Sequence, residues 1–327
     1  SVAAPAPVDT AAEAGKVNSK FGGVQIGTIT YSWRSMPGGL ENIIKYCQEA
    51  NISSIELMGG DLEAYLGAPE NPMMKFFRQQ APQPAAKPGE KPAVPRRMGP
   101  PKFTPEQQAE IDKYKEEVKA WRLGLDLSKV EGARKLLSDA GISVHIVKMQ
   151  PSGMGSDEEV DYAFKVAKAM GAKAVTDEIN LETAKRVAPF AEKHGMYMAF
   201  HNHMQYAEEG FSCDPILAVS PSIMLNFDAG HFFGSTGIHP NEMIKKYHDR
   251  IYSIHLKDKT GPTTGDQPNT NQVWGQGEMP LEDVLLLIKQ EKWPIYCDIE
   301  LEYDIKPWSD SVKEVGTCVK YARQILM

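Results

Sequence analysis

The stretch DEEVDYAFKVAKAMGAKAVTDEINLETAKRVAPFAEKHGMYMAFHNH, residues 157–203, decides the fold class. Apolar residues recur at helical spacing in two segments of this stretch, and each segment ends in a glycine, Gly171 or Gly195. These glycines are predicted helix C-caps, because glycine adopts the left-handed conformation at that position without steric cost. Short β-rich runs follow them, at 172–179 and 196–203. The stretch therefore predicts two successive helix–strand units.

The same alternation of strands and helices continues along the rest of the chain. Eight β-rich runs are predicted strands, at 24–30, 52–58, 142–149, 172–179, 196–203, 222–228, 251–258 and 293–303. Eight strand–helix units in a chain of 327 residues are typical of a (β/α)8 TIM barrel. A doubly wound sheet is the alternative, but no G-x-G-x-x-G pattern follows the first strand.

The barrel is predicted to span residues 21–327, after a flexible leader at 1–20. The leader is rich in Ala and Pro and lacks the apolar core of an intact signal peptide. If it is the remnant of a removed export signal, the protein is periplasmic or secreted; the alternative location is the cytoplasm. After the second strand, 67–104 is a Pro-rich insertion, because that density of Pro does not suit a helix or a central strand. An extra charged helix is predicted at 104–122.

Composition excludes several classes of protein. Lys and Arg number 36 and Asp and Glu 43, for a net charge of −7, which argues against a protein whose affinity comes from neutralising nucleic-acid phosphates. No run approaches the roughly 18 apolar residues of a membrane span. The cysteines form no CxxC pair and give no support to zinc-finger or thioredoxin chemistry; they are Cys47, Cys213, Cys297 and Cys318.

Polar side chains gather at the C-terminal ends of the later predicted strands, where the functional site of such a barrel lies. They are Asp177, Glu178, His201, His203, Asp228, His231, His255, Lys257, Asp298, Glu300 and Glu302. Strand alternation puts Asp298, Glu300 and Glu302 on one face, where their charges would repel unless a cation or protons neutralised them. A bound divalent metal is the simplest solution. Carboxylates with one histidine suit Mn²⁺, Mg²⁺ or Co²⁺, and Zn²⁺ also binds such a set.

From about Gly22 to the C-terminus the chain resembles the sugar phosphate isomerase/epimerase superfamily, the xylose isomerase-like TIM barrels. The pieces that carry this resemblance are FDAGH (227–231), IHLKD (254–258), WGQGEMPLEDVL (274–285) and CDIELEY (297–303). The resemblance implies one divalent metal ion, with manganese expected first and magnesium, cobalt or zinc as alternatives. It also implies a small-molecule carbohydrate as substrate.

The resemblance assigns roles to particular residues. It implies that the metal ligands are Glu178, Asp228, His255 and Glu300, and that Glu178 and Glu300 are also the catalytic pair. Substrate contacts fall on His203, His231 and Lys257. Trp33 and Trp274 could stack on a sugar ring, although a core position is an equal alternative for either.

The expected activity is a metal-dependent isomerase or epimerase of a sugar or sugar derivative, working through an enediolate. The alternative is a lyase or dehydratase acting on a keto-sugar, a 3-keto-glycoside or an inosose. A sugar-binding barrel without catalysis is less favoured, because all four ligands are present. An endonuclease of abasic DNA shares the fold, but of its multi-zinc ligand set the chain offers only Glu56 and His145. We expect no nucleic-acid partner. The insertion is expected to cover the pocket or to contact another subunit of a homo-oligomer.

Overall fold

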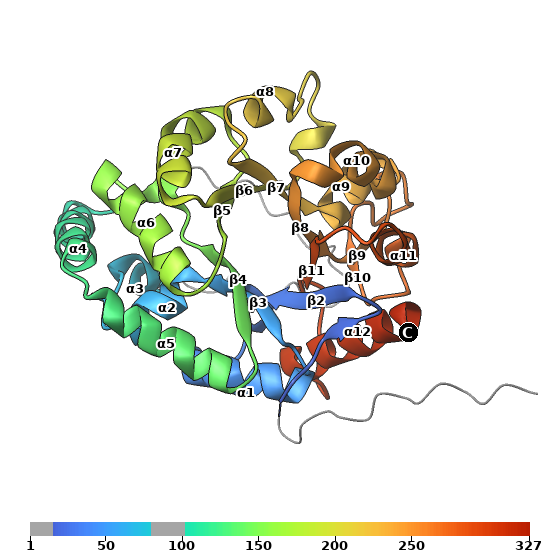
Figure 1. The fold of residues 1–327 in the computed structure, drawn as a ribbon, viewed down its shortest axis with the longest axis horizontal. Helices are drawn as coiled ribbons and strands as arrows, with labels where there is room; N and C mark the ends of the chain where they lie inside the picture. The colour runs from blue at the N-terminus through green and yellow to red at the C-terminus, as the bar shows by residue number, and fades with distance from the viewer. Residues whose placement is uncertain (1–15, 80–101) are drawn as a thin grey trace, which may run out of the picture.

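A computed structural model describes residues 16–79 and 102–327 of the chain, and in these residues eight parallel strands close into a barrel surrounded by helices (Figure 1). Around the barrel the strands are β2 (Val24–Ile29), β11 (Tyr296–Ile299), β8 (Ile251–Leu256), β7 (Ile223–Asp228), β6 (Tyr197–His201), β5 (Ala174–Glu178), β4 (Ser143–Lys148) and β3 (Ser54–Met58). The barrel closes where β2 pairs with β3, with Thr28 opposite Ile55. The predicted (β/α)8 TIM barrel is confirmed.

The helices form the outer layer. They are α1 (Leu40–Ala50), α2 (Gly59–Tyr65), α3 (Pro72–Gln79), α4 (Pro105–Leu123), α5 (Leu127–Asp139), α6 (Asp157–Ala169), α7 (Leu181–His194), α8 (Asp214–Leu217), α9 (Ala229–Thr236), α10 (Pro240–Tyr247), α11 (Leu281–Glu291) and α12 (Ser311–Leu326). Gly195 caps α7 with φ +62°, and Gly171 follows α6 with φ +84°. The left-handed backbone that the sequence predicts at these two glycines is therefore present.

Short strands lie beside the barrel, and polar side chains lie in its interior. β1 (Lys20–Phe21) pairs antiparallel with β2, and β9 (Asp258–Lys259) pairs with β10 (Asn271–Gln272) beyond the end of β8. Inside the barrel, His145 donates to Asp298 over 2.7 Å, and its other ring nitrogen lies 2.7 Å from the hydroxyl of Ser54. These groups are buried, so the contacts satisfy polar atoms that water does not reach.

The region after β3 differs in part from the expected extended insertion. The Pro-rich part, residues 80–101, lies outside the described residues, as do residues 1–15 of the predicted leader. Helix α3 occupies the start of the region, which the sequence analysis did not predict. Helix α4 begins with a capping box, in which Thr104 and Gln107 each accept a hydrogen bond from the other's backbone N–H.

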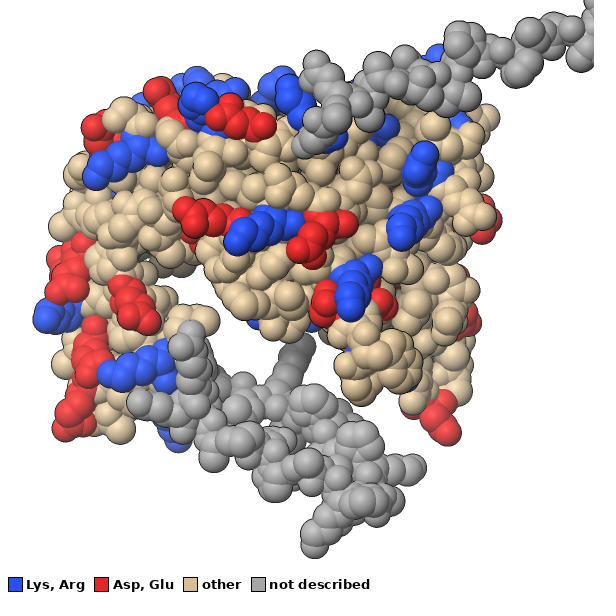
Figure 2. Space-filling model, turned by 90° about the horizontal axis from the view of Figure 1, so that it is seen from below, with Lys and Arg blue, Asp and Glu red and all other residues tan. Residues whose placement is uncertain are grey.

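The charged surface, the helices and the cysteines show no special feature in the described residues. On the face shown in Figure 2, the described Lys and Arg side chains are interspersed with Asp and Glu side chains, as on a solvated surface. No helix in the described ranges is both long and apolar enough to cross a bilayer. The four cysteines are buried free thiols.

One largely buried ion network joins α4 to the barrel. The guanidinium of Arg122 makes two hydrogen bonds to Glu63 of α2, at 2.8 and 3.0 Å, and one to Glu159 of α6, at 2.7 Å. Tyr162 also donates to Glu63. A forked guanidinium between two carboxylates gives strong and directional bonds. Arg122 is therefore the residue that fixes the end of α4 to the helices around the barrel.

We expect Arg122→Ala to lower the free energy of unfolding by about 2 kcal/mol, because Glu63 and Glu159 would lose their cation. Urea denaturation followed by circular dichroism measures the change. The matched control is Lys113→Ala, which breaks only the exposed pair with Glu117 and should cost less than about 0.5 kcal/mol. Equal stability of Arg122→Ala and the wild type would show that the network does not hold α4.

Candidate metal centre and active site

Asp228 ends β7 and uses its two carboxylate oxygens for different purposes. Oδ1 accepts from the backbone N–H of His231 at 2.9 Å, which caps α9. Oδ2 faces the barrel axis, where it accepts from His201 at 2.9 Å and lies 3.0 Å from the ammonium of Lys257. Asn202 fixes the backbone of Asp228 from the neighbouring strand end. Asp228 is therefore both a helix cap and a site residue.

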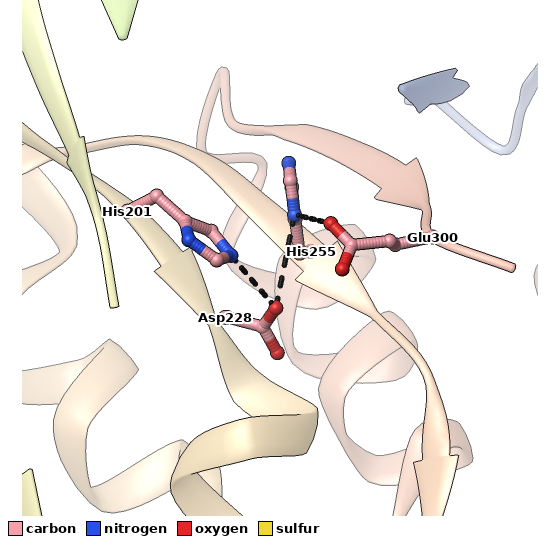
Figure 3. A group of neighbouring side chains, drawn as sticks. All are labelled: His201, Asp228, His255 and Glu300. Carbon is pink, nitrogen blue, oxygen red and sulfur yellow. Dashed lines mark hydrogen bonds and ion pairs between the residues drawn. The ribbon is translucent and has the colours of Figure 1, made fainter. Parts of the chain in front are cut away.

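Strand register brings four donor side chains together. Asp228 lies opposite His255 in the β7–β8 pairing, and Glu300 follows the end of β11. Figure 3 shows His201, Asp228, His255 and Glu300 pointing toward one another. One donor atom from each lies within 4.8 Å of the others, and all four residues are buried. Asp228, His255 and Glu300, three of the four ligands expected from the resemblance, are thus neighbours.

The geometry at His255 fits a cation. Its Nδ1 lies 2.6 Å from Oε2 of Glu300 and 3.7 Å from Oδ2 of Asp228, yet this buried nitrogen makes no hydrogen bond. Donor atoms that crowd together without hydrogen-bonding one another are arranged as ligands around a common ion would be. Nitrogen with carboxylate oxygens is a donor set that manganese, zinc and related divalent ions accept.

A buried chain of hydrogen bonds orients the His255 ring. Nε2 of His255 donates to Glu56 at 2.9 Å, Glu56 accepts from Asn226 at 2.7 Å, and Asn226 accepts from Ser253 at 2.7 Å. Carboxylates commonly hold the outer nitrogen of a metal-binding histidine in this way. Burial alone would lower the pKa of His255, but the charges of Glu56 and Glu300 raise it well above its ordinary value. A metal would therefore compete with a proton at Nδ1.

Glu178 lies in an adjacent donor set. One of its oxygens accepts from His201 at 2.8 Å and the other from His203 at 2.7 Å. His201 therefore bridges Glu178 and Asp228, a position that the sequence analysis did not assign to it. Although burial acts in the opposite direction, the two histidines lower the pKa of Glu178 to about 2. Direct ligation of a metal by Glu178 stays a prediction.

Lys257 faces carboxylates at the centre of the site. Its ammonium donates to Glu300 at 2.6 Å, to His231 at 3.1 Å and also to Glu302. This lysine neutralises Glu300 and Glu302, and His145 pairs with Asp298, so the three carboxylates whose repulsion suggested a metal already have partners. The case for a metal rests on the donor atoms around His255 instead. The substrate contact predicted for Lys257 stays a prediction.

Glu302 is a site residue at a predicted strand end, and its sequence position alone did not predict a role for it. It lies at the rim of the site, with its side chain 25% exposed, and reaches Lys257. Burial, followed by hydrogen bonding with Glu300, raises its pKa, whereas the charge of Lys257 holds the pKa of Glu300 well below its ordinary value against the effect of burial. Its shared face with Glu300 was the sequence signal that could have identified it.

The remaining predicted residues have mixed placements. His231 is buried beside Lys257, and burial lowers its pKa to about 3, so its ring is neutral at pH 7. His203 is half exposed beside Glu178. Trp33 and Trp274 are buried in the hydrophobic core, packed edge-on against Tyr46 and Tyr321, an environment that does not favour stacking on a sugar.

The WGQGEM motif has a structural use. Both carboxylate oxygens of Asp258 accept backbone N–H bonds from this segment, from Gly275 at 2.8 Å, Gly277 at 2.9 Å and Met279 at 3.3 Å. A Cβ on Gly277 would collide with the Asp258 carboxylate, so glycine is needed there. Asp258 thus holds the loop that follows β10 next to the site.

Comparison with known proteins shows which family the chain belongs to. The family model described as a xylose isomerase-like TIM barrel matches residues 113–320. An inosose dehydratase of Clostridium botulinum (strain Alaska E43 / Type E3) is 28% identical over 137 residues, which are 36% of this chain and 45% of that protein. The chain thus spans less than half the length of this curated relative.

Two solved structures share the fold. A sugar phosphate isomerase/epimerase from Parabacteroides distasonis has a TM-score of 0.57 at 16% identity, over 97% of this chain and 98% of that one. The IOLI protein, with a bound zinc atom, has a TM-score of 0.57 at 12% identity, over 93% and 98%. At such identities the likeness shows the fold alone. The family model covers more than half of the chain, and this chain therefore belongs to the xylose isomerase-like TIM barrels.

Proposed function

We propose that this chain is a divalent-metal-dependent lyase that eliminates a β-hydroxyl or β-alkoxy group from a keto-sugar, a 3-keto-glycoside or an inosose. The observation that carries the proposal is the placement of Glu178 and Glu302 around the buried donor atoms. Glu178 ends β5 and Glu302 follows β11, and three strands separate β5 from β11 in either direction around the closed barrel. The two carboxylates therefore come from opposite walls of one site.

The two carboxylates differ in the way that elimination needs. Glu178, with its side chain 35% exposed and its pKa about 2 because of the two histidines, is the base that takes the proton next to the carbonyl. Glu302, whose pKa burial raises, supplies a proton to the departing oxygen. The C–H electron pair is first held in the enediolate and then forms the new double bond as the C–O bond breaks. The departing oxygen takes the proton from Glu302 and leaves as water or as an alcohol. Paired groups whose surroundings separate their pKa values are a common acid–base arrangement.

The proposed metal would be held by Asp228, His255 and Glu300, with Glu178 or His201 completing the set. When bound, such an ion polarises a carbonyl and stabilises the enediolate charge. Lys257 keeps Glu300 and Glu302 in position, and the hydrogen bond to Glu56 orients the ring of His255, as would be needed to hold such an ion. Manganese, magnesium, cobalt and zinc all suit these donors. The zinc atom of the IOLI protein is consistent with the proposal.

A sugar isomerase or epimerase is the second candidate. Glu178 on β5 and Glu300 after β11 come from opposite sides of the barrel, and exchange of a proton between opposite faces of one carbon needs a pair of groups placed in this way. The name of the curated relative, an inosose dehydratase, supports elimination. Both reactions begin with the same removal of a proton, so the measured product distinguishes them.

The metal site is tested with Asp228→Asn, which removes a charged donor while preserving shape. After loading with Mn²⁺ and desalting, the wild type should hold about one metal ion per chain by inductively coupled plasma mass spectrometry, and Asp228→Asn only a trace. Asp139→Asn, which changes only an exposed pair with Lys135, should keep the full content. If the wild type takes up neither manganese nor zinc, the chain is better explained as a sugar-binding barrel without catalysis.

The reaction is tested with scyllo-inosose and a 3-keto-glucoside in D₂O. The wild type should release an unsaturated ketone, seen by ultraviolet absorbance, and Glu178→Gln should slow its release by about 10²- to 10⁴-fold. Glu302→Gln should retain deuterium exchange at the carbon next to the carbonyl while losing elimination, because only proton delivery to the leaving group is removed. Glu182→Gln, an exposed change on α7, is the control.

Exchange followed by an epimer or isomer in the NMR spectrum, with no unsaturated product, would replace the lyase by the second candidate. No exchange on any keto-sugar, in a chain that has taken up its metal, would contradict both reactions.

A further inference from the structure

Lys259 has a largely buried side chain, and its ammonium has no partner among the described residues. It is 4% exposed, yet its ammonium makes no hydrogen bond, ion pair or ring contact with any residue in the described part of the chain. Lys257 lies two residues earlier in the same segment, and its ammonium contacts three carboxylates and a histidine. A buried charge is costly unless something pairs with it. The contrast indicates that Lys259 is available to pair with a group that is not among the described residues, such as a bound ligand.

Helix α9 is built to make room for both lysines. A Cβ on Gly230 would overlap the side chain of Lys257, and a Cβ on Gly234 would lie 2.9 Å from Cε of Lys259. These two glycines are one helical turn apart in GHFFG, so the lysine stems pass over the same face of α9. Of these two lysines, Lys257 alone has an ammonium that is paired with carboxylates among the described residues.

A second unpartnered polar atom lies at the same glycine. The position of a Cβ on Gly234 would also collide with Oδ1 of Asn269, an oxygen that is buried and makes no hydrogen bond. Asn269 is held in a left-handed conformation with φ +50°, and its backbone N–H donates to Gly261 at 3.1 Å. The space above Gly234 is thus bordered by one donor and one acceptor, and neither has a partner among the described residues.

Lys259 adjoins the candidate active site without belonging to its carboxylate set. Burial, followed by the charge of Lys257, lowers the pKa of Lys259 to about 8, and the carboxylates of Asp228, Glu302 and Glu300 act against these effects. Lys259 in turn contributes to the low pKa of His231, after burial and Lys257. Because Gly230 lies against Lys257 and Gly234, one helical turn later, lies against Lys259, the subsite at Lys259 is next to the carboxylate set.

We propose that Lys259 and Asn269 form a subsite for a carboxylate-bearing sugar, with the ammonium pairing with the carboxylate and Oδ1 of Asn269 accepting from a neighbouring hydroxyl. The inference rests on the proposed function and narrows its substrate to keto-sugar acids. A carboxylate carries one charge and matches one ammonium that has no partner among the described residues. A phosphate dianion commonly uses several N–H donors or a free helix N-terminus, and Asp228 already caps the N-terminus of α9.

The test measures Kd by calorimetry on the metal-loaded chain, with 2-keto-D-gluconate, D-fructose and D-fructose 6-phosphate as probes. The wild type should bind the keto acid at least about 10-fold more tightly than D-fructose. Lys259→Met should remove this preference and leave the Kd of D-fructose within about twofold. Lys245→Met, a change on the exposed side of α10, should behave as the wild type.

Three outcomes overturn the subsite: a keto-acid preference that survives Lys259→Met, no measurable binding of the keto acid, or a larger Lys259-dependent gain for D-fructose 6-phosphate. Failure of the proposed function is distinguishable. If the chain binds the keto acid through Lys259 but catalyses no deuterium exchange, the subsite is supported and the proposed lyase activity is contradicted. If the chain catalyses deuterium exchange on neutral keto-sugars but does not bind the keto acid more tightly, the proposed activity is supported and the subsite is contradicted.

Thermal stability gives a second readout. Lys259→Met should keep or raise the Tm, because the free protein loses an unpaired buried charge. Lys257→Met should lower the Tm, because Asp228, Glu300 and Glu302 lose their cation. A fall in Tm for Lys259→Met as large as that for Lys257→Met would show that its ammonium serves the fold and would overturn the proposal.

Discussion

The site depends on the compensation of buried carboxylates at one end of the barrel. Asp228 and Glu300 are buried, and a buried carboxylate is tolerated only when a cation or several donors pair with it. Strand β8 supplies both compensating groups from one face, with His255 at its end and Lys257 two residues later. The remaining features serve this arrangement. Glu56 orients the ring of His255, and Gly230 makes room for the stem of Lys257.

This compensation also gives the carboxylates different chemistry. Glu300, paired with Lys257 and His255, stays ionised, while Glu302 at the rim is more easily protonated. On the opposite wall, Glu178 is kept ionised by two histidines. A common barrel can therefore support isomerisation, epimerisation or elimination through small changes in which carboxylate delivers a proton. This is why the fold alone does not define the reaction, and why the proposal rests on particular residues.

The fold was predictable because its signals are local. Apolar spacing and the glycines at 171 and 195 are readable within about forty residues. The positions of Asp228, His255 and Glu300 near the C-terminal ends of predicted strands placed them at one end of the barrel. The bridging role of His201 was missed because it depends on contacts between neighbouring strands. His201 lies on β6 and bonds to Glu178 of β5 on one side and to Asp228 of β7 on the other. The alternation that groups it with His203 was the available signal.

Other misses have the same non-local origin. The pairing of Lys257 with three carboxylates depends on contacts between β7, β8 and the segment after β11, which no single motif displays. The burial of Trp33 and Trp274 includes packing against Tyr46 of α1 and Tyr321 of α12, which lie on other elements of the fold. Helix α3 was not predicted because it directly precedes the Pro-rich run, and the Pro content of 67–104 as a whole is not typical of a helix.

The central claim is that a divalent ion binds at the donor atoms around His255, and anomalous diffraction from crystals soaked in Mn²⁺ tests it most directly. The account predicts one strong peak within bonding distance of Nδ1 of His255 and the facing oxygens of Asp228 and Glu300. Either Glu178 or His201 should complete the set. A peak elsewhere, or none, with the ammonium of Lys257 still bonded to these carboxylates, would contradict the account.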